Sequence, residues 1–306
     1  MQPSGQIDLL SELIRRHFSQ STLLNNWTLD GGISAQMTAL EIVDAAGNRR
    51  RLTLRRPRGN ALAEYRLLRL THRLGLPTPE PIHVEPSTGH ELGPFLLLDH
   101  LDGNLQFAPA NKDSYLRQMA RQLAAIHRVT PLDHDLSFLP QAPTHCQELE
   151  REPASQVDPG FEIDGIGQRL ATTRPEWLNA PVLLHGDYWP GNILWREENL
   201  VCVIDWEDAM VGDPLVDLSM SSLELCWSFG LDGMESFNEQ YLAANHIDTT
   251  DQAYWDLCAA LRIARIVGLN LPSWAANFAG WGRPDIDEIT MRQRFRDFVS
   301  SALEKL

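Results

Sequence analysis

The spacing of apolar residues along the first hundred positions changes from the period of a helix to that of a strand. Apolar side chains in residues 7–18 recur at intervals of three and four, which predicts a helix. The residues that follow alternate or form short apolar runs separated by glycine-containing turns, which is typical of strands. The pattern predicts strands at 27–30, 36–44 and 50–55, a helix at 61–75, and a strand within 93–103.

The chain becomes mostly helical after Gly103. Residues 114–129 form an amphipathic pattern, and the proline-rich stretch 130–180 reads as short helices and loops. Further helices are expected at 214–228, 234–244, 251–270 and 287–304.

This order of elements predicts an α+β fold in two lobes. Residues 1–102 would form a small antiparallel sheet with one crossing helix, and residues 103–306 a larger, mostly helical lobe. A joint is expected near 98–104, and a cleft between two lobes is a common ligand site.

Composition narrows the range of partners. The chain of 306 residues is 43% hydrophobic, has no apolar run near the roughly 18 residues that cross a bilayer, and begins without a secretory signal. Its four cysteines form no CxxC pair, so we expect buried thiols in a reducing cytoplasm. The lack of a long apolar run means that we expect no membrane partner. The net charge of −15 argues against nucleic acid and mildly favours a cationic or metal-bound partner.

The stretch "LLHGDYWPGNILW" (183–195) carries the candidate chemistry. Asp187 and Asn192 stand five residues apart across a Pro-Gly turn. The apolar runs at 193–195 and 200–204 should pair as a hairpin, which would return Asp205 to the side of Asn192. Carboxylate and amide oxygens are ligands that Mg²⁺ prefers, with phosphates completing its shell. Phosphoryl transfer needs such a set, with one acid for the acceptor hydroxyl and two groups for the metal.

Each of these residues also has a purely structural reading. Asp187 could form a turn, Asp205 could cap a helix, and His185 could be a hydrogen-bonded core residue. The joint pattern favours function, because HGDxxxxN, the hairpin, IDW and GDPxxDL follow one another at short spacing.

The segments "HGDYWPGN" (185–192), "VIDWEDA" (203–209) and "GDPLVDLS" (212–219) resemble the aminoglycoside phosphotransferase family of the kinase-like superfamily. The resemblance implies a bilobal, protein-kinase-like fold with ATP as co-substrate, and GTP is left open. It implies that Asp187 is the catalytic acid/base, and that Asn192 and Asp205 are Mg²⁺ ligands. It also implies that His185 braces the loop and that Asp217, on a following helix, hydrogen-bonds it from below.

A phosphate-binding loop is the candidate role of "LDGGISAQMTALEI" (29–42). Gly31, Gly32 and Ser34 lie between two predicted strands, where glycine allows backbone amides to approach phosphate. A hairpin turn is the alternative reading. The segment departs from the commoner family pattern GGxSN at Ala35 and Gln36.

The remaining nucleotide contacts are expected on the next strand and helix and on the joint. Arg55 ends the third strand, where a guanidinium can grip phosphate oxygens. Glu64, on the inward face of the next helix, is expected to pair with Arg55. Backbone groups from Asp99 to Leu101 would hydrogen-bond the purine, as the kinase-like resemblance implies.

The function expected from the sequence is therefore a small-molecule kinase that moves the γ-phosphoryl group of Mg-ATP to a hydroxyl. Its partners would be a nucleotide and a small acceptor, and a cationic amine is one candidate acceptor. That candidate rests on the acidic lobe and on tryptophans that could equally be core residues: Trp189, Trp227, Trp255, Trp274 and Trp281. A nucleotide-binding pseudokinase with a regulatory or scaffolding role is the alternative. A protein kinase is disfavoured because no activation segment ending in APE follows Asp205.

Overall fold

The computed structural model describes residues 4–29, 36–142, 157–161, 163–173, 175 and 178–306. It divides into two compact units. The N-terminal unit comprises Met1–Asp102 and Cys202–Glu207, and the C-terminal unit comprises Gly103–Val201 and Asp208–Leu306. Residues 202–207 therefore belong to the N-terminal unit although they are distant in sequence from the rest of it.

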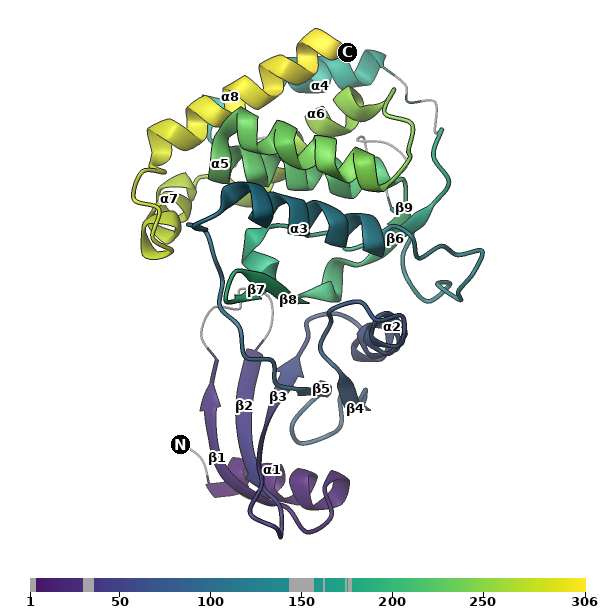
Figure 1. The fold of residues 1–306 in the computed structure, drawn as a ribbon, viewed down its shortest axis with the longest axis vertical. Coiled ribbons are helices and arrows are strands. Elements are labelled where there is room, and N and C mark those ends of the chain that lie inside the picture. The colour runs from purple at the N-terminus through teal and green to yellow at the C-terminus, as the bar shows by residue number, and fades with distance from the viewer. Residues whose placement is uncertain (1–3, 30–35, 143–156, 162, 174, 176–177) are drawn as a thin grey trace. The chain divides into compact units, whose positions relative to one another are not determined.

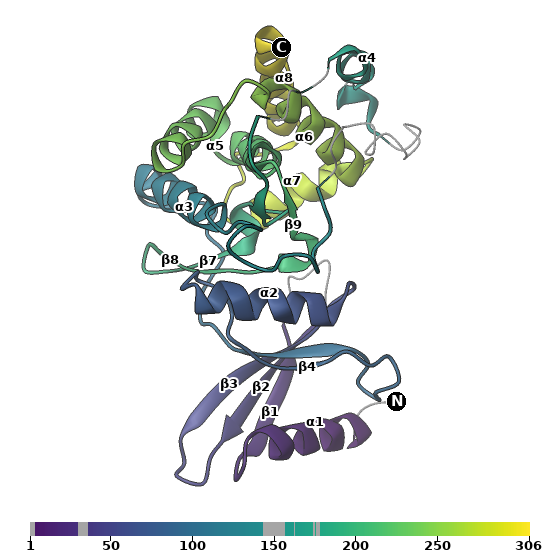
Figure 2. The same cartoon turned by 90° about the vertical axis from the view of Figure 1, so that its right-hand side faces the viewer.

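The N-terminal unit is built on a five-stranded sheet with the order β1-β2-β3-β5-β4, in which all neighbours are antiparallel (Figure 1). Contacts place helix α1 beside β1 and helix α2 beside β4 (Figure 2). The elements are α1 (Ser4–His17), β1 (Thr22–Thr28), β2 (Gln36–Val43), β3 (Arg49–Arg56), α2 (Ala61–Arg73), β4 (Pro81–Glu85) and β5 (Phe95–Asp99).

Apolar residues of β2 and β3 build the core of this unit. Leu40 pairs with Leu52 across the two strands, and both side chains are fully buried. Helix α1 covers this cluster with Leu10 and Ile14, which are 1% and 0% exposed. Asn60 caps the N-terminus of helix α2, and its side chain accepts hydrogen bonds from two backbone N–H groups of the first turn.

The C-terminal unit is mostly helical, and helices α3, α5, α6 and α8 pack on one another (Figure 1). Two two-stranded sheets accompany these helices, namely the antiparallel pair β6 and β9, and β7 with β8. The last two residues of β8 belong to the N-terminal unit. The elements are α3 (Lys112–Ile126), α4 (Asp164–Thr172), β6 (Val182–Leu184), β7 (Ile193–Arg196), β8 (Asn199–Val203), β9 (Met210–Gly212), α5 (Pro214–Ala244), α6 (Gln252–Val267), α7 (Leu271–Gly280) and α8 (Glu288–Lys305).

The α+β fold class predicted from the sequence is confirmed. The N-terminal unit contains α1 in addition to the one crossing helix α2. The two helices expected at 214–228 and 234–244 are joined as α5, which kinks at Gly230 (φ 76°, ψ 178°). Strand β4 and helix α7 were not predicted. Both elements begin at or next to a proline. Because proline usually indicates a turn, the sequence pattern did not reveal these short elements.

The expectation of buried thiols has a mixed outcome. Cys202 and Cys226 are free and buried, as expected. Cys258 is disulfide-bonded, so the expectation of a thiol there is wrong. Among the described residues, no helix combines the length and the apolar character needed to span a bilayer.

The burial of α1 gives a stability prediction. Ile14→Ala removes a fully buried side chain, and we expect it to lower the free energy of unfolding of the N-terminal unit by about 2–4 kcal/mol. Ile7→Ala on the same helix removes a side chain that is 44% exposed, and we expect a change within about 0.5 kcal/mol. Urea unfolding of the full chain, followed by circular dichroism, measures both. Equal losses in the two variants would show that α1 does not pack as described.

Candidate functional site

The HGD loop connects β6 to β7 and is held by one buried carboxylate. Asp217, 1% exposed on α5, accepts the backbone N–H of His185 through Oδ2 at 2.6 Å. Its Oδ1 accepts the N–H of Gly186 at 2.8 Å. The sequence predicted that Asp217 would hydrogen-bond the loop, and this contact is present. Both donors are backbone groups, so the carboxylate fixes the path of the chain immediately before Asp187.

A polar network continues behind Asp217. His127 Nε2 lies 3.2 Å from Asp217 Oδ2, and His127 Nδ1 lies 2.6 Å from the hydroxyl of Tyr241. Burial alone would raise the pKa of Asp217, but the hydrogen bonds and charges of His127 and His185 outweigh it and lower that pKa. Asp217 is therefore held as a carboxylate. His127 and Tyr241 were missed by the sequence analysis because they belong to different helices, 114 residues apart.

Asp187 and Asn192 form a pair across the Pro-Gly turn. The side-chain nitrogen of Asn192 donates to the backbone oxygen of Asp187 at 2.8 Å and to Oδ2 at 2.7 Å. The N–H of Asp187 donates to Nδ1 of the buried His185 at 3.3 Å, a contact within the loop that this histidine was expected to brace. Burial raises the pKa of Asp187, and His185, Arg262 and Asn192 act against this rise. The pair presents one half-buried carboxylate and one carboxamide oxygen on the same short turn.

Arg262 is a residue of the site that the sequence analysis missed. From α6 it donates to the backbone oxygen of Gly186 at 3.0 Å, and it lies 3.9 Å from Asp208. Glu224 of α5 is also close, because the charges of Asp187 and Arg262 both act on its pKa. An arginine inside the apolar run "LCAALRIARIV" was the available signal, since a cation in such a helix needs a polar partner.

The N-terminal unit gathers a second set of charges around Arg55. Its Nε donates to Glu64 at 2.8 Å, which is the predicted ion pair, and its Nη2 donates to Asp205 at 2.7 Å and Glu207 at 3.1 Å. Arg55 and Glu64 are 5% and 6% exposed. Burial raises the pKa of Glu64, opposed by Arg55 and reinforced by Asp205 and Glu207. Three carboxyl groups therefore meet one guanidinium, whereas the sequence predicted that Arg55 would face phosphate.

Asp205 follows the predicted hairpin, which forms as β7 and β8. Its backbone φ is 64°, in the left-handed region that Asp adopts more readily than most residues. The next side chain, Trp206, is buried and donates to the backbone oxygen of Val203 at 3.0 Å. The tight turn after β8 thus directs the Asp205 carboxylate to Arg55.

The other residues predicted to contact the nucleotide lie partly outside and partly inside the described part of the chain. Gly31, Gly32 and Ser34 lie outside the described residues. The N–H of Asp99 donates to the oxygen of Glu80 at 2.9 Å, and its carboxylate pairs with Arg50 at 2.9 Å. The backbone N–H of Asp99 is therefore already used, and the half-buried Leu101 follows two residues later.

The expected metal ligands lie in different units, Asn192 in the C-terminal and Asp205 in the N-terminal unit. Within the described part of the chain, no three His, Cys, Asp or Glu side chains converge as a metal site. In each unit, the expected ligand residue nevertheless offers oxygen atoms of the kind that a hard cation prefers. The amide nitrogen of Asn192 is committed to Asp187, which leaves its oxygen as the ligand atom. Around Arg55, three carboxyl groups share one guanidinium, so the cluster has more acidic groups than a single positive charge can balance.

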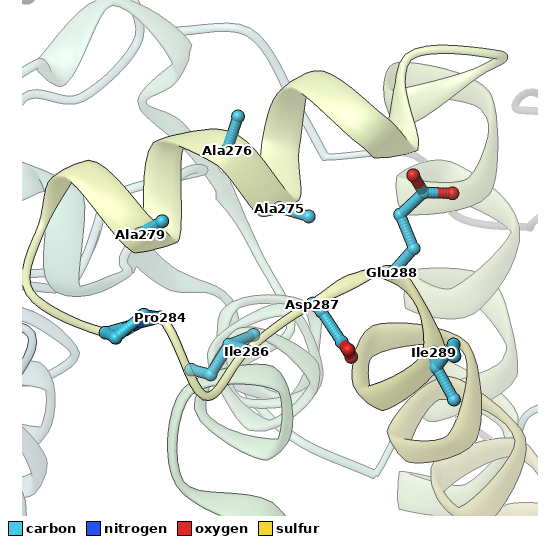
Figure 3. Close-up of a pocket in the computed structure, with 8 residues that line it drawn as sticks. All are labelled: Ala275, Ala276, Ala279, Pro284, Ile286, Asp287, Glu288 and Ile289. Carbon is cyan, nitrogen blue, oxygen red and sulfur yellow. The ribbon is translucent and has the colours of Figure 1, made fainter.

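A cavity of about 500 Å³ lies between α7 and the start of α8, away from the HGD loop in sequence (Figure 3). Ala275, Ala276 and Ala279 line it from the helix. One of its acids, Asp287, caps α8 by accepting the N–H of Thr290 at 2.8 Å. Its lining therefore offers small apolar groups and a helix cap, and we assign the chemistry to the HGD loop.

Comparison with known proteins gives the family of the chain. A model described as the phosphotransferase enzyme family matches residues 29–260. Viomycin phosphotransferase of Streptomyces vinaceus is 27% identical over 161 residues, covering 48% of this chain and 55% of that protein. Acyl-CoA dehydrogenase family member 11 of Homo sapiens is 23% identical over 178 residues, covering 54% of this chain and 23% of that protein. This chain thus spans about a quarter of the length of the acyl-CoA dehydrogenase relatives.

Solved structures of similar fold cover almost the whole chain. A spectinomycin phosphotransferase in complex with ADP and spectinomycin has a TM-score of 0.63 at 16% identity, covering 98% of each chain. An amicoumacin kinase in complex with AMP-PNP and Ca²⁺ has a TM-score of 0.57 at 18% identity, covering 96% of this chain and 94% of that chain. At these identities the likeness shows the fold.

The contacts of Asp217 predict a large loss of stability in Asp217→Asn. An amide would turn an N–H₂ group toward one of the two backbone donors and leave it unpaired, which should cost about 2–4 kcal/mol of unfolding free energy. The loss should persist from neutral pH down to the unfolded pKa near 3.8, because the lowered pKa in the folded state keeps the carboxylate ionised there, and it should shrink as the pH falls further.

Urea unfolding at several pH values measures this loss. Asp232→Asn, an exposed position on the same helix, is the matched control and should change the free energy by less than about 0.5 kcal/mol. A loss at Asp217 no larger than that of the control would contradict the described contacts.

Gly186 gives a second prediction. Its φ is +83°, and an added Cβ would lie 2.1 Å from the backbone oxygen of Asp208. Gly186→Ala should therefore destabilise the C-terminal unit by about 2 kcal/mol or more, through backbone strain and displacement of the loop. Gly167→Ala, in helix α4 with open space around it, should be neutral or stabilising by up to about 1 kcal/mol. Thermal unfolding compares the two, and similar melting temperatures would refute the close approach.

Proposed function

Because this chain belongs to the phosphotransferase enzyme family, we propose that it is a small-molecule kinase that transfers the γ-phosphoryl group of Mg-ATP to a hydroxyl. The observation that carries the proposal is the Asp187–Asn192 pair, held on a loop whose preceding backbone is fixed by Asp217. Positioned side chains of these types are what in-line phosphoryl transfer requires, since the reaction depends on orientation and charge neutralisation.

Asp187 is the proposed acid/base. It accepts the proton of the acceptor hydroxyl as that oxygen bonds to the γ-phosphorus and the bond from phosphorus to the ADP oxygen breaks. Burial raises the pKa of Asp187, which makes its carboxylate a better proton acceptor than an exposed one. The charges of His185 and Arg262 and the hydrogen bond from Asn192 oppose that rise.

Asn192 and Asp205 are the proposed ligands of a divalent cation. When bound, this ion neutralises phosphate charge and holds the triphosphate in line. Three carboxyl groups surround the single guanidinium of Arg55, and this excess of acidic groups supports a role for a cation in the N-terminal unit. The complexes of spectinomycin phosphotransferase with ADP and of amicoumacin kinase with AMP-PNP and Ca²⁺ support nucleotide and cation binding by analogy.

In the nucleotide-bound protein, Arg55 is proposed to contact phosphate while Glu64 keeps its guanidinium in place. Gly31, Gly32 and Ser34 are proposed to cover the triphosphate, and the backbone near Leu101 to bind the purine. The alternative of a pseudokinase has little support, because loss of one of the residues at these positions is the usual mark of a pseudokinase and all three are present here, namely Asp187, Asn192 and Asp205.

The decisive variant is Asp187→Asn. Removing the proton acceptor should lower kcat by roughly 10²-fold to 10⁴-fold while leaving the affinity for Mg-ATP nearly unchanged. A coupled ADP-release assay across amines, sugars and antibiotics identifies an acceptor, and kcat is then measured with that acceptor. A thermal-shift titration with Mg-ATP gives the affinity.

The matched control is Asp113→Asn, at an exposed position in the first turn of α3. It should keep the turnover of the unmodified protein. If Asp187→Asn also keeps it, Asp187 is not the proton acceptor. If Mg-ATP produces no thermal shift in the unmodified protein, neither the kinase nor the pseudokinase is correct.

A further inference from the structure

Three tryptophan rings gather beside the HGD loop in the C-terminal unit. Trp189 follows Asp187 by two residues, and its ring centroid lies 5.9 Å from that of Trp274 and 5.9 Å from that of Trp281. All three side chains are half-buried, so each ring keeps part of its surface accessible. We refer to Trp189, Trp274 and Trp281 as the aromatic wall.

Buried groups hold the wall in place from behind. Phe107, 2% exposed, stacks on Trp281 with centroids 4.3 Å apart and planes at 7°. Phe278, fully buried on α7, meets Trp281 edge-on at 5.5 Å. The ring of Trp189 lies against Gly191, where an added Cβ would come within 2.2 Å of it. The wall is therefore preorganised, which lowers the entropic cost of binding a ligand.

The other tryptophans that the structure describes in this unit are core residues. Trp195, Trp227 and Trp255 are 2%, 0% and 3% exposed. The cluster of three half-buried tryptophans differs from these, because it leaves some apolar surface exposed on and beside the loop that carries a candidate catalytic carboxylate. Apolar surface of this kind, next to a few polar groups, is typical of ligand sites.

The charged groups around the wall are largely compensated. Arg283 donates to the backbone oxygen of Phe107 at 3.2 Å and pairs with Asp285 at 2.7 Å. Glu224 is 4% exposed, and its Oε2 has no hydrogen-bond partner among the described residues. Burial, reinforced by the charge of Asp187, raises the pKa of Glu224 to about 8, so it is mostly uncharged at neutral pH. Asp187 is the nearby acid, and the proposed function commits it to the acceptor hydroxyl. These surroundings therefore favour a ligand whose ring is uncharged, since a desolvated ammonium ion needs an ionised partner of its own.

We propose that the aromatic wall is the acceptor subsite, and that it takes a neutral alcohol whose apolar ring packs against the tryptophans. This inference rests on the proposed function, in which Asp187 accepts the proton of the acceptor hydroxyl. Trp189 links the wall to the loop that carries the proposed proton acceptor, because it follows Asp187 by two residues. The sequence alone suggested a cationic acceptor, and the compensated charges argue for the neutral class instead.

A matched pair of alcohols tests the chemical class. The probes are 3-cyclohexylpropan-1-ol and 3-(piperidin-1-yl)propan-1-ol, which have nearly the same shape, but the second carries a positive charge at neutral pH. Saturation-transfer NMR on the full chain with Mg-ADP measures both dissociation constants. The neutral probe should bind at least about tenfold more tightly, because the charged ring must lose its hydration. Equal binding, or tighter binding of the piperidinium, would overturn the proposal.

Variants of α7 test the location. Trp274→Ala should weaken binding of 3-cyclohexylpropan-1-ol about fivefold, whereas Trp274→Phe, which keeps an aromatic face, should stay within about twofold. Ala276→Ser is the matched control, because Ala276 lines the cavity on another face of the same helix and should leave binding unchanged (Figure 3). Thermal melts establish that each variant is folded. Unchanged binding in a folded Trp274→Ala, or a loss in Ala276→Ser, would place the subsite elsewhere.

Binding and turnover experiments distinguish a wrong acceptor subsite from a wrong catalytic function. Probe binding is measured without turnover, so it reports on the wall even if no phosphoryl group is transferred. Asp187→Asn should bind the neutral probe with an affinity within about twofold of the unmodified protein, because the ring contacts remain. Absence of a Mg-ATP thermal shift would reject the kinase but not the subsite. Phosphorylation of a cationic alcohol in preference to the neutral probe would reject the subsite but not the kinase.

Discussion

One buried carboxylate fixes the geometry on which the candidate site depends. The two oxygens of Asp217 accept the N–H groups of His185 and Gly186, at a position where water does not replace them. Asp187 is the next residue, so the direction of its side chain follows from these two hydrogen bonds. Asn192 then closes the loop by donating to both the backbone oxygen and the carboxylate of Asp187. A long helix thereby determines the shape of a short loop through a single charge.

Charge is arranged differently in the two units. In the C-terminal unit, Arg262 contacts the backbone of Gly186, and its charge favours the ionised form of Asp187 against the effect of burial. In the N-terminal unit, Arg55 meets three carboxyl groups, more than one guanidinium can neutralise. We interpret this surplus as a property of a unit that functions with a bound cation and nucleotide, where added positive charge and phosphate rearrange the partners of Arg55.

Local patterns predicted the parts of the site that lie close together in sequence. The HGDYWPGN motif located the loop, and alternation along β3 with the inward face of α2 predicted the Arg55–Glu64 pair. Contacts over long sequence separations left no comparable signal. Arg262 reaches Gly186 from 76 residues away, and Glu207 joins Arg55 from 152 residues away. Clustering of Trp189, Trp274 and Trp281 likewise depends on the packing of α7, a helix whose short length and initial Leu-Pro concealed it.

The account requires that a phosphoryl group moves from a nucleotide to an alcohol, and ³¹P NMR observes this transfer directly. With the full chain, ATP, Mg²⁺ and an alcohol that supports ADP release, we predict a phosphomonoester resonance that grows in step with ADP and disappears when Mg²⁺ is chelated. A spectrum in which bound ATP yields only inorganic phosphate, with each alcohol left unmodified, would contradict the account.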